Sequence, residues 1–397
     1  LVADQVVAAR RAGHRIVVVV SAMGKTTDGL LALAQAAART GAAPGEPSRR
    51  ELDMLVSTGE RVSMALLSIA LHARGEDAIS FTGSQSGILT TDRHFDARIV
   101  EVRPHRIEEE LARGRIVIVA GYQGMSLRRE ITTLGRGGSD TTAVALAAAL
   151  GAERCEIYSD VDGVYSADPR VVAGARHLPE VSFPLLQELA ESGAKVLNAQ
   201  AVEWARRAGI TLHARKTGDG PGARETVARE APSGPALPNA SYEARGRAVA
   251  SLGNGVSLEA DGVATSDLLE VLEEAGVTPA LVTSAGGCTT AFVSLANVPD
   301  WQGCRGAWAA RVAGLRVHEG RALVSVVGDG LTAPGALPRA LRCLGGAGVA
   351  PAGLLASPLR LAFAVDEAAA GIAQRALHDA FVAAEPPPLA RASLSSR

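Results

Sequence analysis

Aromatic residues are scarce in this chain, since Phe, Trp and Tyr together make up 3% of its 397 residues. Proteins that bind single-stranded nucleic acid stack bases on aromatic side chains, so the composition argues against that role. A surplus of charge is also missing, because the formal net charge is -2 at pH 7. Without a broad basic field we expect neither general nucleic-acid binding nor membrane-surface binding. Small acidic or phosphorylated ligands remain possible, because a local cluster can hold them.

Cysteines and long apolar runs are few as well. The four cysteines lie far apart and form no CxxC pair: Cys155, Cys288, Cys304 and Cys343. This spacing argues against a disulfide framework or a structural zinc site and indicates a reducing compartment, so we expect a cytoplasmic protein. No apolar run approaches the roughly 20 residues of a membrane span. We also expect no secretory signal.

Several common catalytic motifs do not occur. The eight histidines are scattered, with neither HExxH nor a Cys/His ligand spacing, so we expect no metal ligands among the side chains. The GxSxG elbow of serine hydrolases is missing. No GxGxxG follows the first apolar run, which weakens a dinucleotide-binding interpretation.

What the sequence does contain is an alternation of strand-like and helix-like segments over residues 1–216. Apolar runs rich in β-branched residues occur at 16–20, 78–81, 116–120, 156–159 and 211–213. Helical segments lie between them, including 52–74 and 141–150. This alternation predicts an α/β fold, a mostly parallel sheet sandwiched by helices. Ligands of such sheets bind where the carboxyl ends of the strands meet the following turns, and four polar turns occupy such places.

The amino-acid composition changes after residue 216. Residues 217–246 are rich in Gly, Pro, Ala and Ser and are the best candidate for a linker. Two short βαββ-like units come next, with helices expected at 265–275 and around 337–344. Their similarity suggests a duplicated regulatory or dimerisation module. Two unrelated α+β pieces are the alternative.

The most informative stretch is TTLGRGGSDTTAVALAAAL, residues 132–150. A glycine-rich turn with one Arg and one Asp opens into an Ala/Leu helix, for which Ser139 or Asp140 is a plausible N-cap. Free backbone N–H groups, a positive helix end and a guanidinium suit a phosphate or carboxylate ligand. An ordinary capped turn between a strand and a helix is the alternative interpretation.

Polar residues also follow the run at 156–159. Asp160 and Asp162 come first, followed by Tyr165, Asp168 and Arg170. This cluster could hold a nucleotide, with Arg170 on phosphate oxygens and Tyr165 near the base or ribose. A polar turn made rigid by Asp side chains is the alternative.

Three other features are ambiguous taken one at a time. SAMGKTTD at 21–28 offers hydroxyl and ammonium donors without the spacing of a phosphate loop, so alone it indicates a solvated turn. Glu60, alone, is more typical of a surface carboxylate. Lys195 is either a helix-surface lysine or a second phosphate contact.

Taken together, the motifs resemble those of a known family. SAMGKTTD, MLVSTGER, FTGSQSGILTTDRH, IVAGYQG, TTLGRGGSDTTAVALAAALGA and CEIYSDVDGVYSADPR, in this order and spacing, are similar to aspartokinases of the amino-acid-kinase superfamily. The similarity is nearly continuous from about residue 15 to 216. The C-terminal third is similar only in outline, with its tandem units where aspartokinases carry two ACT regulatory domains. The resemblance implies an amino-acid-kinase-like (carbamate-kinase-like) sheet sandwiched by helices, followed by two ACT-like units.

The resemblance also implies an activity. This is the ATP- and Mg²⁺-dependent phosphorylation of the β-carboxylate of L-aspartate to 4-phospho-L-aspartate, the first step toward lysine, threonine, methionine and diaminopimelate. By resemblance, Arg136 and Asp140 are catalytic. The residues implied to bind aspartate are Thr27, Glu60, Arg136, Gly137, Gly138 and Ser139. Those implied to bind the nucleotide are Ser21, Ser159, Asp160, Tyr165, Arg170 and Lys195. A carboxylate nucleophile is already ionised near neutral pH and needs no strong general base.

The sequence departs from the family pattern in three places. Aspartokinases begin with a strand and a K-[FY]-G-G-[ST] loop that binds ATP phosphates, which does not precede Leu1 in this sequence. We therefore expect an upstream truncation, with a non-catalytic nucleotide- or amino-acid-binding regulatory homologue as the alternative. Asn198-Ala199 replaces the His-Pro common in the family. ADGVATSD at 260–267 replaces the D-x-P-G effector turn, so we expect weakened feedback by lysine and threonine.

These expectations define a domain plan. We predict a catalytic domain at 1–222, a linker at 223–246, ACT-like units at 247–318 and 319–388, and a tail at 389–397. Because ACT-type units usually pair between chains, we expect a homo-oligomer, either a dimer or a tetramer. Another amino-acid kinase, acting on glutamate, acetylglutamate or a nucleotide, is a further possibility that the full motif set disfavours.

Overall fold

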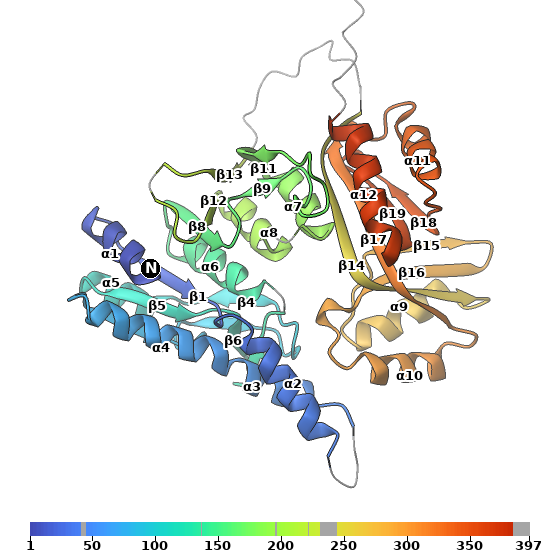
Figure 1. Cartoon of the computed structure of the whole chain (residues 1–397). Helices are drawn as coiled ribbons and strands as arrows, with labels where there is room; N and C mark the ends of the chain where they lie inside the picture. The colour runs from blue at the N-terminus through green and yellow to red at the C-terminus, as the bar shows by residue number, and fades with distance from the viewer. Residues whose placement is uncertain (41–44, 136, 195–196, 221, 231–243, 384–397) are drawn as a thin grey trace, which may run out of the picture.

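The first layer of the fold is a three-stranded sheet near the N-terminus. The computed structural model describes residues 1–40, 45–135, 137–194, 197–220, 222–230 and 244–383 (Figure 1). The sheet is parallel throughout, in the order β1 (Val17–Val20), β5 (Ile116–Ala120), β2 (Ala78–Phe81). The central strand, β5, is buried along its whole length. These strands are the β-branched runs of the sequence, and their parallel pairing is as predicted.

Helices cover both faces of this sheet. Ile116 and Ile118 point to one face, where they pack with α1 (Val2–Arg11) and α4 (Thr58–His72). Val117 and Val119 point to the other, where they pack with α5 (His105–Ala112) and α6 (Gly138–Ala149). Successive side chains of a strand alternate between faces, so an all-apolar run requires cover on both sides. The predicted α/β fold class is confirmed.

A second sheet lies at the other flank of α6. Its order is β11 (Glu180–Ser182), β13 (Glu225–Arg229), β12 (Thr211–Lys216), β8 (Arg154–Ser159). The β8–β12 and β11–β13 pairs are parallel, whereas β12–β13 is antiparallel. Two helices, α7 (Phe183–Glu191) and α8 (Ala199–Ala208), share its core with α6. Because α6 contacts both β1 and β8, it joins the two sheets.

Two smaller sheets complete the N-terminal part of the fold. One sheet has the order β4 (Ile99–Val102), β3 (Ile88–Thr90), β6 (Gln123–Ser126), β7 (Ile131–Thr133). Strand β7 leads directly into the glycine-rich turn before α6. The other group is an antiparallel pair, β9 (Val164–Tyr165) and β10 (His177–Leu178), beyond the end of β8.

The helix predicted at 52–74 is two helices, α3 (Arg49–Val56) and α4, with a break at Ser57. At the break the Ser57 and Thr58 hydroxyls donate to the carbonyls of Met54 and Leu55, at 3.1 and 2.7 Å, and the amide of the buried Gln123 donates to the Ser57 carbonyl at 2.9 Å. By length and composition alone, the stretch Arg49–His72 could cross a membrane. In this fold its α4 half packs on β2 and β5, as a core helix does.

The C-terminal part is built on one six-stranded sheet. Its order is β15 (Leu281–Ala285), β16 (Cys288–Ser294), β14 (Arg245–Asp261), β17 (Arg316–Asp329), β19 (Arg360–Asp366), β18 (Gly353–Ala356). The helices that pack on it are α9 (Thr265–Glu274), α10 (Trp301–Arg311), α11 (Ala336–Gly346) and α12 (Ala370–His378). Two repeats of similar plan are therefore present, as predicted, but they share β14 and β17.

A bend in β14 separates the two repeats. Pairing with β17 shifts register between Leu252 and Gly255. At Asn254 the backbone has φ 50, in the left-handed region. A Cβ on Gly255 would lie 2.3 Å from the Phe292 ring, so only glycine fits there. Before the bend β14 packs with α11 and α12, and after it with α9 and α10.

Candidate active site

The turn before α6 is built on left-handed glycines. Gly135 has φ 71 and Gly137 has φ 72, a conformation that glycine adopts without strain. Gly137 is the N-cap of α6, and its carbonyl already accepts from the N–H groups of Asp140 and Thr141. The predicted N-cap at Ser139 or Asp140 was therefore wrong, because the left-handed glycine starts the helix earlier. Both residues lie in the first helical turn.

The start of α6 lies against the carboxyl ends of β1 and β5. A Cβ built on Gly121, the residue after β5, would lie 2.7 Å from Ser139 Oγ and 2.9 Å from a methyl group of Val19. The Leu134 N–H donates to the Tyr122 carbonyl at 2.9 Å. Tyr122 has φ 67, an uncommon conformation for a residue with a side chain. The turn is thus pressed onto the sheet at the edge where ligands of parallel sheets bind.

Glu60 lies in the first turn of α4 and is 3% exposed. Its Oε1 accepts from the Ala22 N–H at 3.0 Å. Its Oε2 is buried without a hydrogen-bond partner among the described residues. Burial raises the pKa of this carboxyl to about 7. The surface-carboxylate alternative is therefore wrong for Glu60, because Gly59 packs α4 so tightly on Ala22 that a Cβ there would lie 2.8 Å away.

Asp140, which is half-buried, is the second carboxyl at this edge. Burial raises the pKa of Asp140 to about 6, although the backbone N–H of Asn198 donates to it and opposes the shift. Asn198 also covers the turn itself, since a Cβ on Gly137 would lie 2.8 Å from the Asn198 side chain. Thr141 Oγ1 donates to Asn198 Oδ1 at 3.2 Å. The Asn-Ala departure from the family pattern therefore lies directly over the glycine turn.

The cluster after β8 is held together by its own hydrogen bonds. The Tyr165 hydroxyl donates to Asp162 Oδ1 at 2.8 Å, and its ring meets that of His177 edge-on at 5.4 Å. Arg224 donates to the Tyr165 hydroxyl at 3.3 Å and lies 3.5 Å from Asp162. Ser159 Oγ bonds the backbone of Val161 at 3.2 Å. This geometry agrees with the rigid-turn interpretation and leaves the nucleotide prediction untested.

Arg170 and Asp160 project outward from the same cluster. The Arg170 guanidinium binds Asp168 through Nε at 3.0 Å and Nη2 at 2.8 Å. This pairing raises the pKa of Arg170, whose side chain is 79% exposed. Asp160 is exposed. Both residues are accessible to a phosphorylated ligand.

The remaining predicted residues divide between the two edges. Ser21, directly after β1, is exposed, and Thr27, in the first turn of α2 (Thr26–Ala38), is half-buried. Between them, the Ala22 N–H donates to Glu60. Gly138 is buried, and a Cβ on it would lie 2.7 Å from Leu134 Cβ. Arg136 and Lys195 lie outside the described residues. Among the described residues, the structure therefore brings the predicted aspartate residues Thr27, Glu60, Gly137, Gly138 and Ser139 to the edge formed by β1, β5, α4 and α6. It places Ser159, Asp160, Tyr165 and Arg170, predicted to bind the nucleotide, at or beyond the end of β8.

Sequence reasoning missed a buried carboxylate behind this site. Asp53 is 0% exposed and accepts from Thr133 Oγ1 at 2.6 Å, from the Phe95 N–H at 3.1 Å and from His94 Nδ1 at 2.6 Å. Thr133 is the last residue of β7, so Asp53 supports the start of the glycine turn. One signal was available, because Asp53 stands between Leu52 and Val56 on the apolar face of α3. Sequence reasoning also missed Arg224, which contacts Tyr165 and Asp162, and no pattern in the sequence pointed to it.

Substitution of Gly137 tests the turn. We expect Gly137→Ala to lower any kinase activity at least tenfold, because the new Cβ would strike Asn198 and shift the start of α6. A left-handed alanine costs about 1–2 kcal/mol by itself. Gly209→Ala is the matched control, since Gly209 has φ +67 with nothing within 4 Å of its Cβ position. Equal effects of the two substitutions on activity and on thermal unfolding would contradict the role of the turn.

The N-terminal half of this chain is similar in sequence to known proteins. The sequence profile of the amino acid kinase family matches residues 1–215. The aspartokinase of Mycobacterium bovis is 53% identical over 223 residues, which are 56% of this chain and 52% of that protein. The chain therefore spans about half the length of the curated relatives that it matches.

Two solved structures extend the likeness beyond the matched segment. Aspartokinase III of E. coli in complex with aspartate and ADP (R-state) is 27% identical, with a TM-score of 0.73, over 89% of this chain and 79% of that chain. The same enzyme in complex with lysine and aspartate (T-state) is 26% identical, with a TM-score of 0.60, over 85% of this chain and 76% of that chain. Both alignments reach into the C-terminal sheet, since they cover far more than residues 1–215.

Proposed function

Because this chain belongs to the amino acid kinase family, we propose that it transfers the γ-phosphoryl group of ATP to the β-carboxylate of L-aspartate. The products are 4-phospho-L-aspartate and ADP. A β-carboxylate oxygen forms a bond to the γ-phosphorus as the bond from that phosphorus to the β,γ-bridging oxygen breaks. No proton has to be removed from the nucleophile near neutral pH.

The observation that carries this proposal is the unpaired carboxylate oxygen of Glu60. A buried oxygen without a partner is unfavourable unless a ligand supplies one. The α-ammonium group of aspartate would supply both the donor and the charge. Thr27 lies in the adjoining segment and would add a hydroxyl. Pairing with the ammonium group would also stabilise the ionised form of the Glu60 carboxyl, whose pKa is about 7.

The carboxylates of aspartate would then meet the start of α6. The backbone N–H group of Ser139 lies at the positive end of this helix, which favours a bound anion, whereas the Gly138 N–H already donates to the Gly135 carbonyl at 3.1 Å. By the resemblance of the turn, Arg136 would bind a carboxylate through both guanidinium nitrogens. Asp140 would act by fixing the turn, because it accepts the Asn198 N–H. Gly137 is required for its conformation.

The nucleotide would lie toward the end of β8. Ser159 and Asp160 lie there as the residues implied to bind the nucleotide, and we propose that ATP binds as its magnesium complex. Mg²⁺ would neutralise charge on the phosphates during transfer. Arg170, Ser21 and Lys195 would bind phosphate oxygens, and Tyr165 the nucleoside. Positioning and charge neutralisation are the main requirements of phosphoryl transfer.

An acyl-phosphate trap tests the reaction. Aspartate, ATP, Mg²⁺ and hydroxylamine are incubated with the protein, and aspartyl hydroxamate is measured. Two forms are compared: this chain, and this chain extended by an N-terminal strand with a K-[FY]-G-G-[ST] loop. Hydroxamate from either form supports the proposal.

A non-catalytic binding protein is the second candidate function. One observation favours it: among the described residues, β1 and β8 are edge strands of two separate sheets, so no continuous sheet joins the proposed aspartate and nucleotide sites. If neither form yields hydroxamate but calorimetry detects aspartate or ADP, this second function replaces the first.

Arg170 offers a test of the nucleotide half. We expect Arg170→Met to raise KM for ATP about tenfold and to leave KM for aspartate unchanged, because one phosphate contact is lost. Arg154→Met is the matched control, because Arg154 is an arginine at the start of β8, whereas the predicted nucleotide residues lie at and beyond its end. A rise in KM for aspartate alone would contradict the assignment.

We also propose the wider organisation expected from the sequence. The division at 222, 246, 318 and 388 stays a proposal about the sequence, although β13 (Glu225–Arg229) joins the second kinase sheet and both repeats share β14 and β17. We also propose a cytoplasmic protein, which the four free cysteines support. The exposed edge strands β15 and β18 favour pairing with a second copy into a dimer or tetramer. Weak feedback by lysine and threonine is proposed from the ADGVATSD segment, and strong inhibition at sub-millimolar effector would contradict it.

A further inference from the structure

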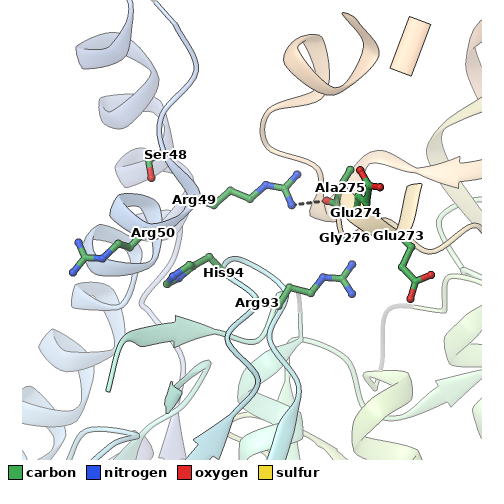
Figure 2. Close-up of a pocket in the computed structure, with 9 residues that line it drawn as sticks. All are labelled: Ser48, Arg49, Arg50, Arg93, His94, Glu273, Glu274, Ala275 and Gly276. Carbon is green, nitrogen blue, oxygen red and sulfur yellow. Dashed lines mark hydrogen bonds between the residues drawn. The ribbon is translucent and has the colours of Figure 1, made fainter. Parts of the chain in front are cut away.

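A cavity of about 430 Å³ lies between α3 and α9, where the kinase part meets the first C-terminal repeat (Figure 2). The proposed reaction does not use it. Its lining comes from the start of α3, from the loop after β3 and from the end of α9. A volume of this size is in the range of small-molecule sites.

The two walls of the cavity are fixed to each other by Arg49. This arginine binds Asp300 through Nη2 at 2.6 Å and Nε at 3.2 Å. Its Nη1 donates to the Ala275 carbonyl, at the end of α9, at 2.8 Å. Burial between the domains and the Asp300 carboxylate act in opposite directions on the pKa of Arg49, which is raised. A bidentate, partly buried pair of this kind holds a defined spacing.

The walls carry opposite charge. The kinase wall presents guanidinium groups and an imidazole, from Arg49, Arg50, Arg93 and His94. The opposite wall presents the carboxylates of Glu273 and Glu274 and the carbonyl end of α9, which is the negative end of a helix. A ligand that fills the space therefore meets positive charge on one side and negative charge on the other.

Most of these groups are already paired. Arg50 binds Glu51 and Glu130, and Glu274 binds Arg311. Arg93 and Glu273 differ, because neither side chain forms a hydrogen bond or a contact ion pair with any described residue, although the charge of Arg93 partly opposes the effect of burial on the pKa of the Asp96 carboxyl.

The two unpaired side chains face the cavity from opposite walls. The Arg93 Nε is buried, and its guanidinium lies against Gly276, where a Cβ would be only 2.6 Å from Nε. Figure 2 shows the guanidinium of Arg93 and the carboxylate of Glu273 pointing toward the same space without a bond between them.

We propose that this cavity binds a free amino acid by its two charged ends. The α-carboxylate pairs with Arg93, and the α-ammonium group pairs with Glu273. A purely anionic ligand would meet the two glutamates, and a purely cationic ligand would meet the arginines, so only a zwitterion is matched by both walls. Binding at this site goes beyond the proposed kinase reaction and does not depend on it.

Calorimetry on the full chain tests the site without an activity assay. Each of the common protein amino acids other than aspartate, which the proposed kinase site would itself bind, is titrated in turn, with sodium phosphate as a probe for the anion alone and methylammonium chloride as a probe for the cation alone. We expect at least one amino acid to bind, and both Arg93→Met and Glu273→Gln to weaken that binding at least tenfold. The matched controls are Arg98→Met, in the same loop, and Glu270→Gln, one turn earlier on α9, neither of which lines the cavity.

The outcomes separate clearly. Tenfold weakening in both cavity variants, with both controls within twofold of the parent chain, supports the site. Binding that survives both cavity variants belongs elsewhere on the chain and overturns the proposal, as does phosphate or methylammonium binding as tightly as the amino acid. Absence of binding by every amino acid overturns it too. Thermal unfolding of each variant shows that the fold is retained, since Arg93 and Glu273 contribute no bond of their own.

Discussion

Replacement of Glu60 by glutamine is expected to lower kcat/KM for aspartate about 100-fold, mainly through KM, in whichever form of the chain is active. The lost interaction is a buried, charge-assisted contact with the substrate ammonium, of a kind worth up to about 3 kcal/mol. Hydroxamate formation at varied aspartate concentration measures it. Glu109→Gln, on an exposed position of α5, is the control. An unchanged KM would remove Glu60 from the site.

The pH dependence makes this prediction more specific. Because burial raises the pKa of Glu60 to about 7, the carboxylate that pairs with the ammonium is lost as the pH falls through 7. Aspartate affinity should therefore fall below pH 7 and level off above it. In the Glu60→Gln variant the same profile should be flat. A profile unchanged by the substitution would contradict the assignment.

Stability should change in the opposite direction to activity. The folded pKa of Glu60 lies above its ordinary value of 4.5, so the buried charge destabilises the fold increasingly as pH rises from about 4.5 through 7. Glu60→Gln removes this penalty. We expect the ligand-free variant to melt at a higher temperature than the parent chain at pH 8 and at a similar temperature at pH 4.5. A residue that served only structure would not combine lost activity with gained stability.

Asp53→Ala is expected to produce the largest loss of stability, about 3–4 kcal/mol. The substitution leaves the Thr133 hydroxyl, the Phe95 N–H and the His94 ring without their acceptor in a buried place. Phe95 has φ 70, so its left-handed backbone also loses the contact that holds it. Urea unfolding measures the change.

Asp53→Asn and Glu51→Ala complete this series. The asparagine keeps one acceptor oxygen and should lose less stability than the alanine. Glu51 is exposed on the same helix, so Glu51→Ala should stay within about 0.5 kcal/mol of the parent chain. A loss below about 1 kcal/mol for Asp53→Ala would show that the three donors find other partners, and that Asp53 does not support the turn.

The sequence was sufficient for the sheet and its helices. Uninterrupted β-branched runs such as 116–120 require cover on both faces, so they predict a parallel sheet between helices, and β5 is such a strand. The residues at which the helices begin and end were harder to predict from the sequence. The start of α6 depends on the left-handed conformation of Gly137, and the Ser57 carbonyl at the break between α3 and α4 accepts from Gln123, which is 66 residues away.

The environment of the candidate site could not be predicted from the sequence. In the sequence Glu60 is typical of a surface carboxylate. Its burial results from the packing of Gly59 on Ala22, a contact between distant segments. The joint between Arg49 and Asp300 connects residues 251 positions apart. Composition and periodicity carry no information about such contacts. The assignments of individual residues to aspartate and nucleotide therefore stay predictions, to be decided by the substitutions above.

The shared strands of the C-terminal sheet limit how this region can be divided. β14 and β17 each pass through both repeats, so removal of either repeat would leave the other with half of two strands and an open apolar face. The pair should therefore melt in a single cooperative transition. Recombination between related genes could exchange the two repeats only together, so their sequences are constrained to diverge as one unit.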